Sequence, residues 1–433
     1  MNSKLQNNKQ DQHPADFADK LQQLPVEEAV EILRDLPREK ASAVLAELDR
    51  QNASEILTEF STDEISRMLI GLPHDDAADL IAGLPEEQHQ QVLNQLLPAE
   101  SVKVSKLLHY PQDSAGGIMT DRFIALPSDA TIKQSRETLR SKEDKEYKGT
   151  SYLYVVDSNQ KLIGIISMRD LVFRMPDRKI CEVMDRNVKA VSVNDDQEKV
   201  AKLFAQYHYM ALPVIETDGR LMGIVEANSV IDVIQEEVTE DMELMVGVSG
   251  EETAYTPWRK AVPKRLPWLY VNLITACLSA SVIALFENTI ARWTALAIFF
   301  PIIAGQGGST GMQTLTVIIR SIALGEISFK DSRNALNKEI LVGLVNGLAV
   351  GIVAGIIGFI WKGSIILGVI ASIAMFLNML AAVFAGVVIP FGLKIMKIDP
   401  ALASSILLTT VTEIGGFGIF LGLGTLVLKL SGI

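Results

Sequence analysis

The chain has 433 residues, more than one compact domain usually holds, so the sequence predicts several domains. Residues 1–258 carry 27 Lys and Arg against 46 Asp and Glu, whereas residues 259–433 carry 13 against 6. An acidic first part argues against nucleic acid as a partner and for cations, and two cysteines cannot build a disulfide framework. The N-terminus is polar and has no apolar signal-peptide core, so we expect residues 1–258 to stay in the cytoplasm.

Residues 17–118 are predicted to form an all-helical N-terminal domain. Leu24-Pro25, Leu36-Pro37 and related pairs recur every 12 residues, with the last pair one residue late. A proline at the first helical position, followed by acids, predicts short helices that stack into a superhelix. Asp75 and Asp79 share one helix face, so they are either dipole-matching caps or a shared divalent-cation site.

A duplicated α/β unit is predicted over 119–178 and 179–235. Met119-Thr120 is echoed by Met184-Asp185, and LIGIISMRDLV by LMGIVEANSVI further along. Each copy is expected to run strand, helix, two short strands and helix. In this order and in these motifs the unit resembles a pair of CBS domains, a family that binds adenosine nucleotides.

The CBS resemblance implies that a Ser/Thr-x-x-Asp motif after the last strand holds the ribose. Ser167 and Asp170 match it, whereas the second copy, Glu226 to Ser229, lacks the Asp. At most one nucleotide site is therefore expected. The alternative is that Asp170 merely caps the next helix.

An acidic connecting helix is predicted over 236–258. An acidic stripe begins just before it and runs at helical spacing through Asp232, Glu236, Glu240 and Glu243. Like charges four residues apart destabilise a helix. Either solvent screens this stripe, or divalent cations bridge it to the acidic domains and hold the parts together until the ions leave.

Residues 259–433 are predicted to be a helical membrane domain with five spans, at 266–286, 293–319, 340–361, 365–393 and 401–430. Three flanking cations, Arg292, Lys362 and Lys429, lie on one side. Ten lie on the other: Arg259, Lys260, Lys264, Arg265, Arg320, Lys330, Arg333, Lys338, Lys394 and Lys397. This asymmetry predicts cytoplasmic N-terminal domains, and an odd number of spans then places the C-terminus outside.

Polar residues within the spans predict a cation path. Glu413 is the only acid of the last span, and a charge at that depth costs at least about 2.5–3.5 kcal/mol unless it faces a bundle interior or water. Pro301 and the run from Gly305 to Gln313 predict a broken second span, which is tolerated only where it is buried or lines a cavity. The candidate pore residues are Gly307, Gly308, Ser309, Gln313, Asn378, Thr409, Thr410 and Glu413.

Two alternatives stay open for these residues. Glu413 could be protonated and hold helices together, and each polar side chain could make an interhelical hydrogen bond. Oxygen-only lining suits a hard cation. The sequence shows no set of nucleophile, base and orienting group, so an enzyme is not expected.

The domain order, with RLPWLYVNLITACLSA, PIIAGQGG, LTVIIRSIALGEI, DPALASS and TTVTEIGGF, resembles the MgtE family of magnesium channels. The resemblance implies a homodimer in the cytoplasmic membrane, with a pore on the two-fold axis lined by the second and fifth spans. It also implies closure by cytoplasmic Mg²⁺ bound to the acidic domains, tuned by ATP at the CBS pair.

The resemblance further implies roles for single residues. It places the pore acid at Glu413 and N-domain sensor acids at Asp75 and Asp79. It places the connecting-helix sensor acids at Asp232, Glu236, Glu237, Glu240 and Asp241. Four positions depart from the family: Glu413 stands for its usual Asp, Ser309 for its Asn, and Asn228-Ser229 for an acidic pair.

Two other functions compete with a magnesium channel. One is a transporter of another divalent cation, such as Co²⁺, Mn²⁺ or Ca²⁺. The other is a membrane-anchored CBS nucleotide sensor that transports nothing.

Overall fold

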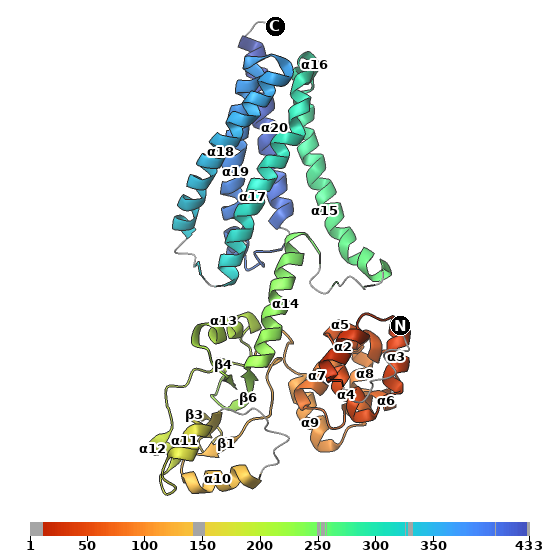
Figure 1. The fold of residues 1–433 in the computed structure, drawn as a ribbon, viewed down its shortest axis with the longest axis vertical. Coiled ribbons are helices and arrows are strands. Elements are labelled where there is room, and N and C mark those ends of the chain that lie inside the picture. The colour runs from red at the N-terminus through yellow and green to blue at the C-terminus, as the bar shows by residue number, and fades with distance from the viewer. Residues whose placement is uncertain are drawn as a thin grey trace. The chain divides into compact units, whose positions relative to one another are not determined.

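The structure, a computed structural model, describes residues 12–141, 152–248, 252, 256, 258–324, 326–327, 332–402 and 404–430. The chain divides into two compact units, Met1–Glu236 and Glu237–Ile433. Figure 1 shows their helices and strands. Lys330, one of the ten flanking cations, lies outside the described residues, as does the side chain of Lys260.

Short helices make up the N-terminal domain. They are α2 (Pro14–Leu21), α3 (Val26–Arg34), α4 (Arg38–Ala46), α5 (Arg50–Leu57), α6 (Thr62–Leu69), α7 (His74–Ala82), α8 (Glu86–Leu93) and α9 (Pro98–Leu107). Each helix from α2 to α7 packs against the second helix after it in the chain, so that α2 contacts α4 and α7 contacts α9. The apolar face of each helix is thereby buried, with Val44, Leu57 and Ile81 fully enclosed, as the 12-residue repeat predicted.

The structure corrects the expected place of the prolines. Pro25, Pro37, Pro73 and Pro85 lie at the N-cap, one residue before each helix, whereas Pro98 does lie at the first helical position. The four N-cap prolines have φ between −57° and −49° and ψ between 138° and 146°. This is the extended conformation that a proline ring favours and that an N-cap residue adopts.

Two similar sheets follow. The first contains β1 (Ala125–Pro127), α10 (Ile132–Ser141), β2 (Tyr152–Val156), β3 (Leu162–Ser167), α11 (Met168–Phe173) and α12 (Ile180–Val183). The second contains β4 (Val191–Ser192), α13 (Gln197–Tyr207), β5 (Ala211–Ile215), β6 (Leu221–Glu226) and α14 (Ala227–Met245). Both sheets place the middle strand parallel to the first and antiparallel to the third, which confirms the predicted duplication.

Backbone bridges join the two copies across their interface. Thr120 pairs with Ile224 of the second copy, and Asp185 pairs with Ile165 of the first. A Cβ at Gly223 would lie 2.7 Å from the sulfur of Met119. The repeated Met and Gly positions are therefore explained by this close approach, which a larger residue than glycine would prevent.

The membrane unit contains α15 (Trp258–Leu285), α16 (Glu287–Arg292), the 3₁₀ turn η1 (Thr294–Phe299), α17 (Phe300–Ala323), α18 (Ser332–Lys362), α19 (Ile365–Ile395) and α20 (Ser404–Leu430). Among the described residues, five segments are long and apolar enough to span a membrane, as predicted. Helix α19 packs against α17, α18 and α20 and forms the centre of the bundle. Close packing against α18 depends on glycine, because a Cβ at Gly355 would lie 2.9 Å from the carbonyl oxygen of Gly368.

Three local predictions are corrected. The Gly305–Gln313 run does not break the second span: α17 is helical throughout, and the irregular backbone is the 3₁₀ turn before Pro301. The third span begins at Arg333 rather than residue 340, so Glu339 falls inside it. Helix α14 begins at Ala227 and ends at Met245, not at residue 258, since Gly247 adopts a φ of 76° that ends the helix.

Candidate functional site

A polar stripe runs along α17 and is uncovered in the single chain. Its members are spaced three or four residues apart and are all exposed: Gln306, Ser309, Gln313, Thr316 and Arg320. Amide, hydroxyl and charged groups are not tolerated against lipid in the middle of a bilayer. This side of α17 therefore faces water or another protein surface, and the predicted Ser309 and Gln313 belong to it.

Helix α20 carries the predicted carboxylate beside α17. Glu413, Thr409 and Thr410 are half-buried, and α20 packs along α17. Both threonine hydroxyls donate to carbonyls of their own helix, Thr409 to Ser405 at 2.8 Å and Thr410 to Ile406 at 2.7 Å. Within the described residues the Glu413 carboxylate has no hydrogen bond or ion pair, so it does not tie helices together inside one chain.

Asn378 of α19 lies behind this surface rather than on it. Its side chain is fully buried, and its Nδ2 donates to the carbonyl of Ile303 on α17 at 3.0 Å. A Cβ at Gly307 would lie 2.3 Å from the same nitrogen, and one at Gly416 of α20 would lie 2.7 Å away. Asn378 and Gly307 thus hold α17, α19 and α20 in register, whereas Gly308 has open space beside it.

A second acid in the membrane unit escaped the sequence analysis. Glu339 of α18 is buried and accepts a hydrogen bond from the Thr314 hydroxyl of α17 at 3.0 Å. Its other oxygen pairs with the exposed Lys338 at 3.0 Å. Because the third span is predicted to begin at residue 340, Glu339 falls just outside it and is not among the candidate residues.

The end of α14 packs against the membrane helices. Met245 shares a hydrophobic cluster with Leu315 and Ile319 of α17, Ala385 of α19, and Leu408 of α20. The Ser405 hydroxyl at the start of α20 donates to the Met245 carbonyl. These contacts lie near the C-terminal end of α17 and at the N-terminal end of α20. Along the axis of α20, Ser405 and Glu413 are about 12 Å apart.

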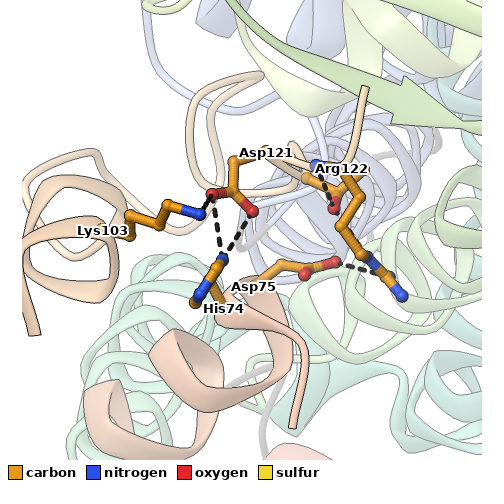
Figure 2. A network of polar contacts seen from close by, with 6 residues as sticks. His74, Asp75, Lys103, Asp121 and Arg122 are labelled. Carbon is orange, nitrogen blue, oxygen red and sulfur yellow. Dashed lines mark hydrogen bonds and ion pairs between the residues drawn. The ribbon is translucent and has the colours of Figure 1, made fainter. Parts of the chain in front are cut away.

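A charged network joins α7 to the segment that enters the first sheet (Figure 2). The His74 ring nitrogen Nδ1 lies 2.9 Å from both carboxylate oxygens of Asp121, and Lys103 lies 3.7 Å from the same group. The guanidinium of Arg122 donates to Asp75 at 3.2 Å. The predicted sensor acid Asp75 therefore has a cationic partner already, which spacing within α7 could not reveal.

Repulsion among the carboxylates of α7 is only partly relieved. Burial, followed by repulsion from Asp75, raises the pKa of Asp76 to about 7, against the attraction of Arg122. Burial also raises the pKa of Asp79 to about 6, with Arg50 opposing and Asp75 and Glu236 adding to the rise. The Oδ1 atom of Asp75 is buried and has no hydrogen-bond partner in the described structure. Two half-buried acids and an unpartnered oxygen fit a divalent cation, which prefers oxygen ligands.

The connecting-helix acids are differently placed. Asp232, Glu236 and Glu240 are exposed, whereas Glu237 and Asp241 are half-buried. Of these, Glu236 is brought near the α7 acids, since it acts on Asp79. Among the described residues, no three His, Cys, Asp or Glu side chains form a ready-made metal cluster. An ion here would keep most of its water, as Mg²⁺ commonly does.

The predicted nucleotide motif lies at the start of α11. The Ser167 hydroxyl caps this helix by accepting from the Asp170 backbone nitrogen at 3.0 Å, and it donates to the Asp170 carboxylate at 2.7 Å. Asp170 also pairs with Arg174 at 3.4 Å. Arg169, Asp170, Phe173 and Arg174 line a surface hollow of about 590 Å³. Two guanidinium groups and an aromatic ring suit a phosphate and a base.

Three family models match the chain. A divalent cation transporter model, MgtE, matches residues 300–423, and a model of the MgtE intracellular N domain matches residues 12–113. The CBS domain model matches residues 115–177 and 180–236.

Curated relatives match along most of their length. The chain is 34% identical over 333 residues to the magnesium transporter MgtE of Bacillus subtilis (strain 168), covering 77% of this chain and 74% of that protein. It is 33% identical over 346 residues to the magnesium transporter MgtE of Thermus thermophilus (strain ATCC 27634), covering 78% and 76%. A solved structure, the cytosolic domain of the Mg²⁺ channel MgtE in complex with ATP, is 33% identical, covers 52% of this chain and 91% of that one, and has a TM-score of 0.48.

Replacing Gly307 by Ala should destabilise the membrane unit, because its Cβ would overlap the Asn378 amide. Overpacking of this kind costs about 1–3 kcal/mol. Gly308→Ala is the matched control, since it adds the same methyl to the same helix in open space. We expect thermal unfolding of the detergent-solubilised chain, followed by tryptophan fluorescence, to shift down for Gly307→Ala alone. Equal midpoints for the two variants would contradict the Asn378 packing.

Proposed function

The chain belongs to the MgtE family of magnesium transporters, and from this we propose that it is a Mg²⁺ channel closed by Mg²⁺ bound to its own cytoplasmic domains. Three family models along the chain and relatives at about one-third identity support the family. The geometry of this chain supports an ion path, a gate and a sensor.

The uncovered polar stripe of α17 carries the proposal. Gln306, Ser309 and Gln313 are exposed in the single chain, and Glu413 lies half-buried on the adjoining α20 without a partner among the described residues. A second copy related by a two-fold axis would cover this surface and leave a polar passage between the copies. We therefore propose a homodimer with its pore on that axis. The C-terminus would lie outside the cell, as the charge asymmetry indicates.

Magnesium would cross this pore largely hydrated. Mg²⁺ holds its waters at about 2.0–2.1 Å and sheds them reluctantly, so carboxylate and hydroxyl groups best contact the water shell. Two Glu413 carboxylates facing each other would concentrate cations and repel anions. Glutamate is one methylene longer than the family's usual aspartate, so its ring of oxygens should be narrower or displaced along the axis.

The gate would be formed by the end of α14. Met245 packs among α17, α19 and α20, and its carbonyl accepts from Ser405. The same helix carries Glu236, whose charge acts on Asp79. Mg²⁺ at the acids of α7 and α14 would remove their repulsion and hold α14 against the pore helices. Loss of the ion would release it.

The hollow at Asp170 is proposed to bind ATP. Arg169 and Arg174 would contact the phosphates, Phe173 the base, and Asp170 the ribose. The second copy, with Glu226 in place of the motif, is not expected to bind a nucleotide in this way.

Glu413→Gln should reduce Mg²⁺ flux by roughly tenfold or more, because it keeps the size of the side chain and removes the charge of the selectivity ring. The measurement is Mg²⁺ uptake into proteoliposomes under an imposed membrane potential. Glu287→Gln, an exposed acid at the start of α16, is the control and should not change flux. Undiminished Mg²⁺ flux in Glu413→Gln would contradict the assignment of Glu413 to the pore. Flux of Co²⁺, Mn²⁺ or Ca²⁺ without flux of Mg²⁺ would show that the transported cation is not Mg²⁺.

Asp79→Asn should leave the channel open at Mg²⁺ concentrations that close the wild type, because one sensor carboxylate is lost. The same flux assay, with Mg²⁺ titrated on the side of the N-terminal domains, measures the closing midpoint. Asp63→Asn, an exposed first-turn acid of α6 in the same domain, serves as the comparison and should close normally. Identical midpoints in all three proteins would argue that the α7 acids are helix caps only.

Asp170→Ala should weaken ATP binding by roughly ten- to a hundredfold, because one charged hydrogen bond to the ribose is worth about 1.5–3 kcal/mol. Equilibrium binding of labelled ATP to the full chain measures this. Asp218→Ala, which removes an exposed acid from the second copy, should bind ATP as the wild type does. If Asp170→Ala lowers only the unfolding temperature, Asp170 supports the start of α11 and does not contact nucleotide.

A further inference from the structure

We infer that Arg122 is a built-in competitor of the magnesium sensor: its guanidinium pairs with Asp75 and opposes the binding of a divalent cation to that carboxylate. The inference rests on the sensor proposed above. It predicts that Arg122 sets the Mg²⁺ concentration at which the cytoplasmic domains respond.

The guanidinium of Arg122 is held in place by the sheet of the second CBS copy. Thr120 exchanges two backbone hydrogen bonds with Ile224, at 2.8 and 3.0 Å. The Thr120 hydroxyl then accepts from the Arg122 backbone nitrogen at 3.2 Å and from its Nε at 3.1 Å. One end of the guanidinium is thus anchored, and the other end reaches Asp75 at 3.2 Å (Figure 2).

This arginine faces more negative charge than it can neutralise. Its positive charge acts on Asp76 and Glu226 as well as on Asp75. One positive charge is therefore shared among three carboxylates. In the sequence Glu226 marks only a departure from the ribose motif, whereas the fold brings it within reach of Asp75 and Arg122.

Arg122 and a divalent ion would compete for the same carboxylate. One oxygen of Asp75 accepts from the guanidinium, and the other is buried without a hydrogen-bond partner in the described structure. A divalent ion bound to Asp75 would lie within a few ångströms of the guanidinium and be repelled by it. The ion either binds more weakly or pushes the guanidinium toward solvent, to which its side chain is already 35% exposed.

Docking of α7 does not depend on Arg122 alone. His74 contacts both oxygens of Asp121 at 2.9 Å, next to the Arg122 pair but separate from it. Removing the guanidinium should therefore leave α7 in place and free Asp75 for the ion. A docking role for Arg122 predicts the opposite change, since its loss would then weaken the response to Mg²⁺.

The test is limited proteolysis by chymotrypsin of the full chain in lipid nanodiscs, with the Mg²⁺ concentration for half-maximal protection as the readout. An ion pair of this exposure is worth up to about 1 kcal/mol, so Arg122→Gln should lower the midpoint about two- to fivefold. Arg122→Lys keeps the charge and should stay near the wild type. Arg220→Gln, which removes an exposed cation paired with Asp218, is the matched control and should not shift the midpoint.

A double-mutant cycle makes the test specific. In an Asp75→Asn background, Arg122→Gln should shift the midpoint less than it does in the wild type, because the contested carboxylate is gone and only the action of Arg122 on Asp76 and Glu226 remains. An unchanged or raised midpoint for Arg122→Gln in the wild-type background would overturn the inference. If the wild type itself shows no Mg²⁺-dependent protection, the proposed sensor fails, and the inference fails with it.

Discussion

The hydrocarbon core of a bilayer offers no water to polar groups, and the structure of the membrane unit follows from this constraint. Backbone groups are satisfied within five helices, yet α17 leaves amides and hydroxyls uncovered beside the carboxylate of Glu413. A single chain is therefore an incomplete object in a membrane. In the proposed homodimer a second copy would face the stripe, and the passage between the copies would supply the water that these groups need.

The uncovered stripe is held by a rigid interior. Helix α19 contacts three other helices, and its fully buried Asn378 bonds to α17 while two glycines allow the helices to close around it. Glu339 and Thr314 add a buried link between α18 and α17. The residues that the sequence predicts to line a pore thus divide into two groups: some lie on the uncovered stripe, and others hold the helices behind it in place.

Charge acts differently in the cytoplasmic domains. There, the carboxylates of Asp75, Asp76 and Asp79 repel one another, and burial raises the pKa values of Asp76 and Asp79. Protonation relieves such repulsion, and so does a cation, of which two kinds are available: the protein's own arginine and an ion from solution. Their exchange at Asp75 would convert an ion concentration into a change in the contacts that hold the cytoplasmic domains together.

The sequence by itself determined the domain order, the helical repeat, the duplicated sheets, the five spans and the polar side chains of the membrane domain. Periodicity and hydropathy are properties of short stretches of sequence, and they are sufficient to predict secondary structure, repeats and membrane spans. The tertiary structure decided which face each residue joins. It showed α17 to be continuous, because helix packing supplies the order that glycine lacks, and it placed Asn378 behind the stripe. It also brought Arg122 to Asp75 across 47 residues, and no spacing rule within one helix or strand encodes a contact between distant segments.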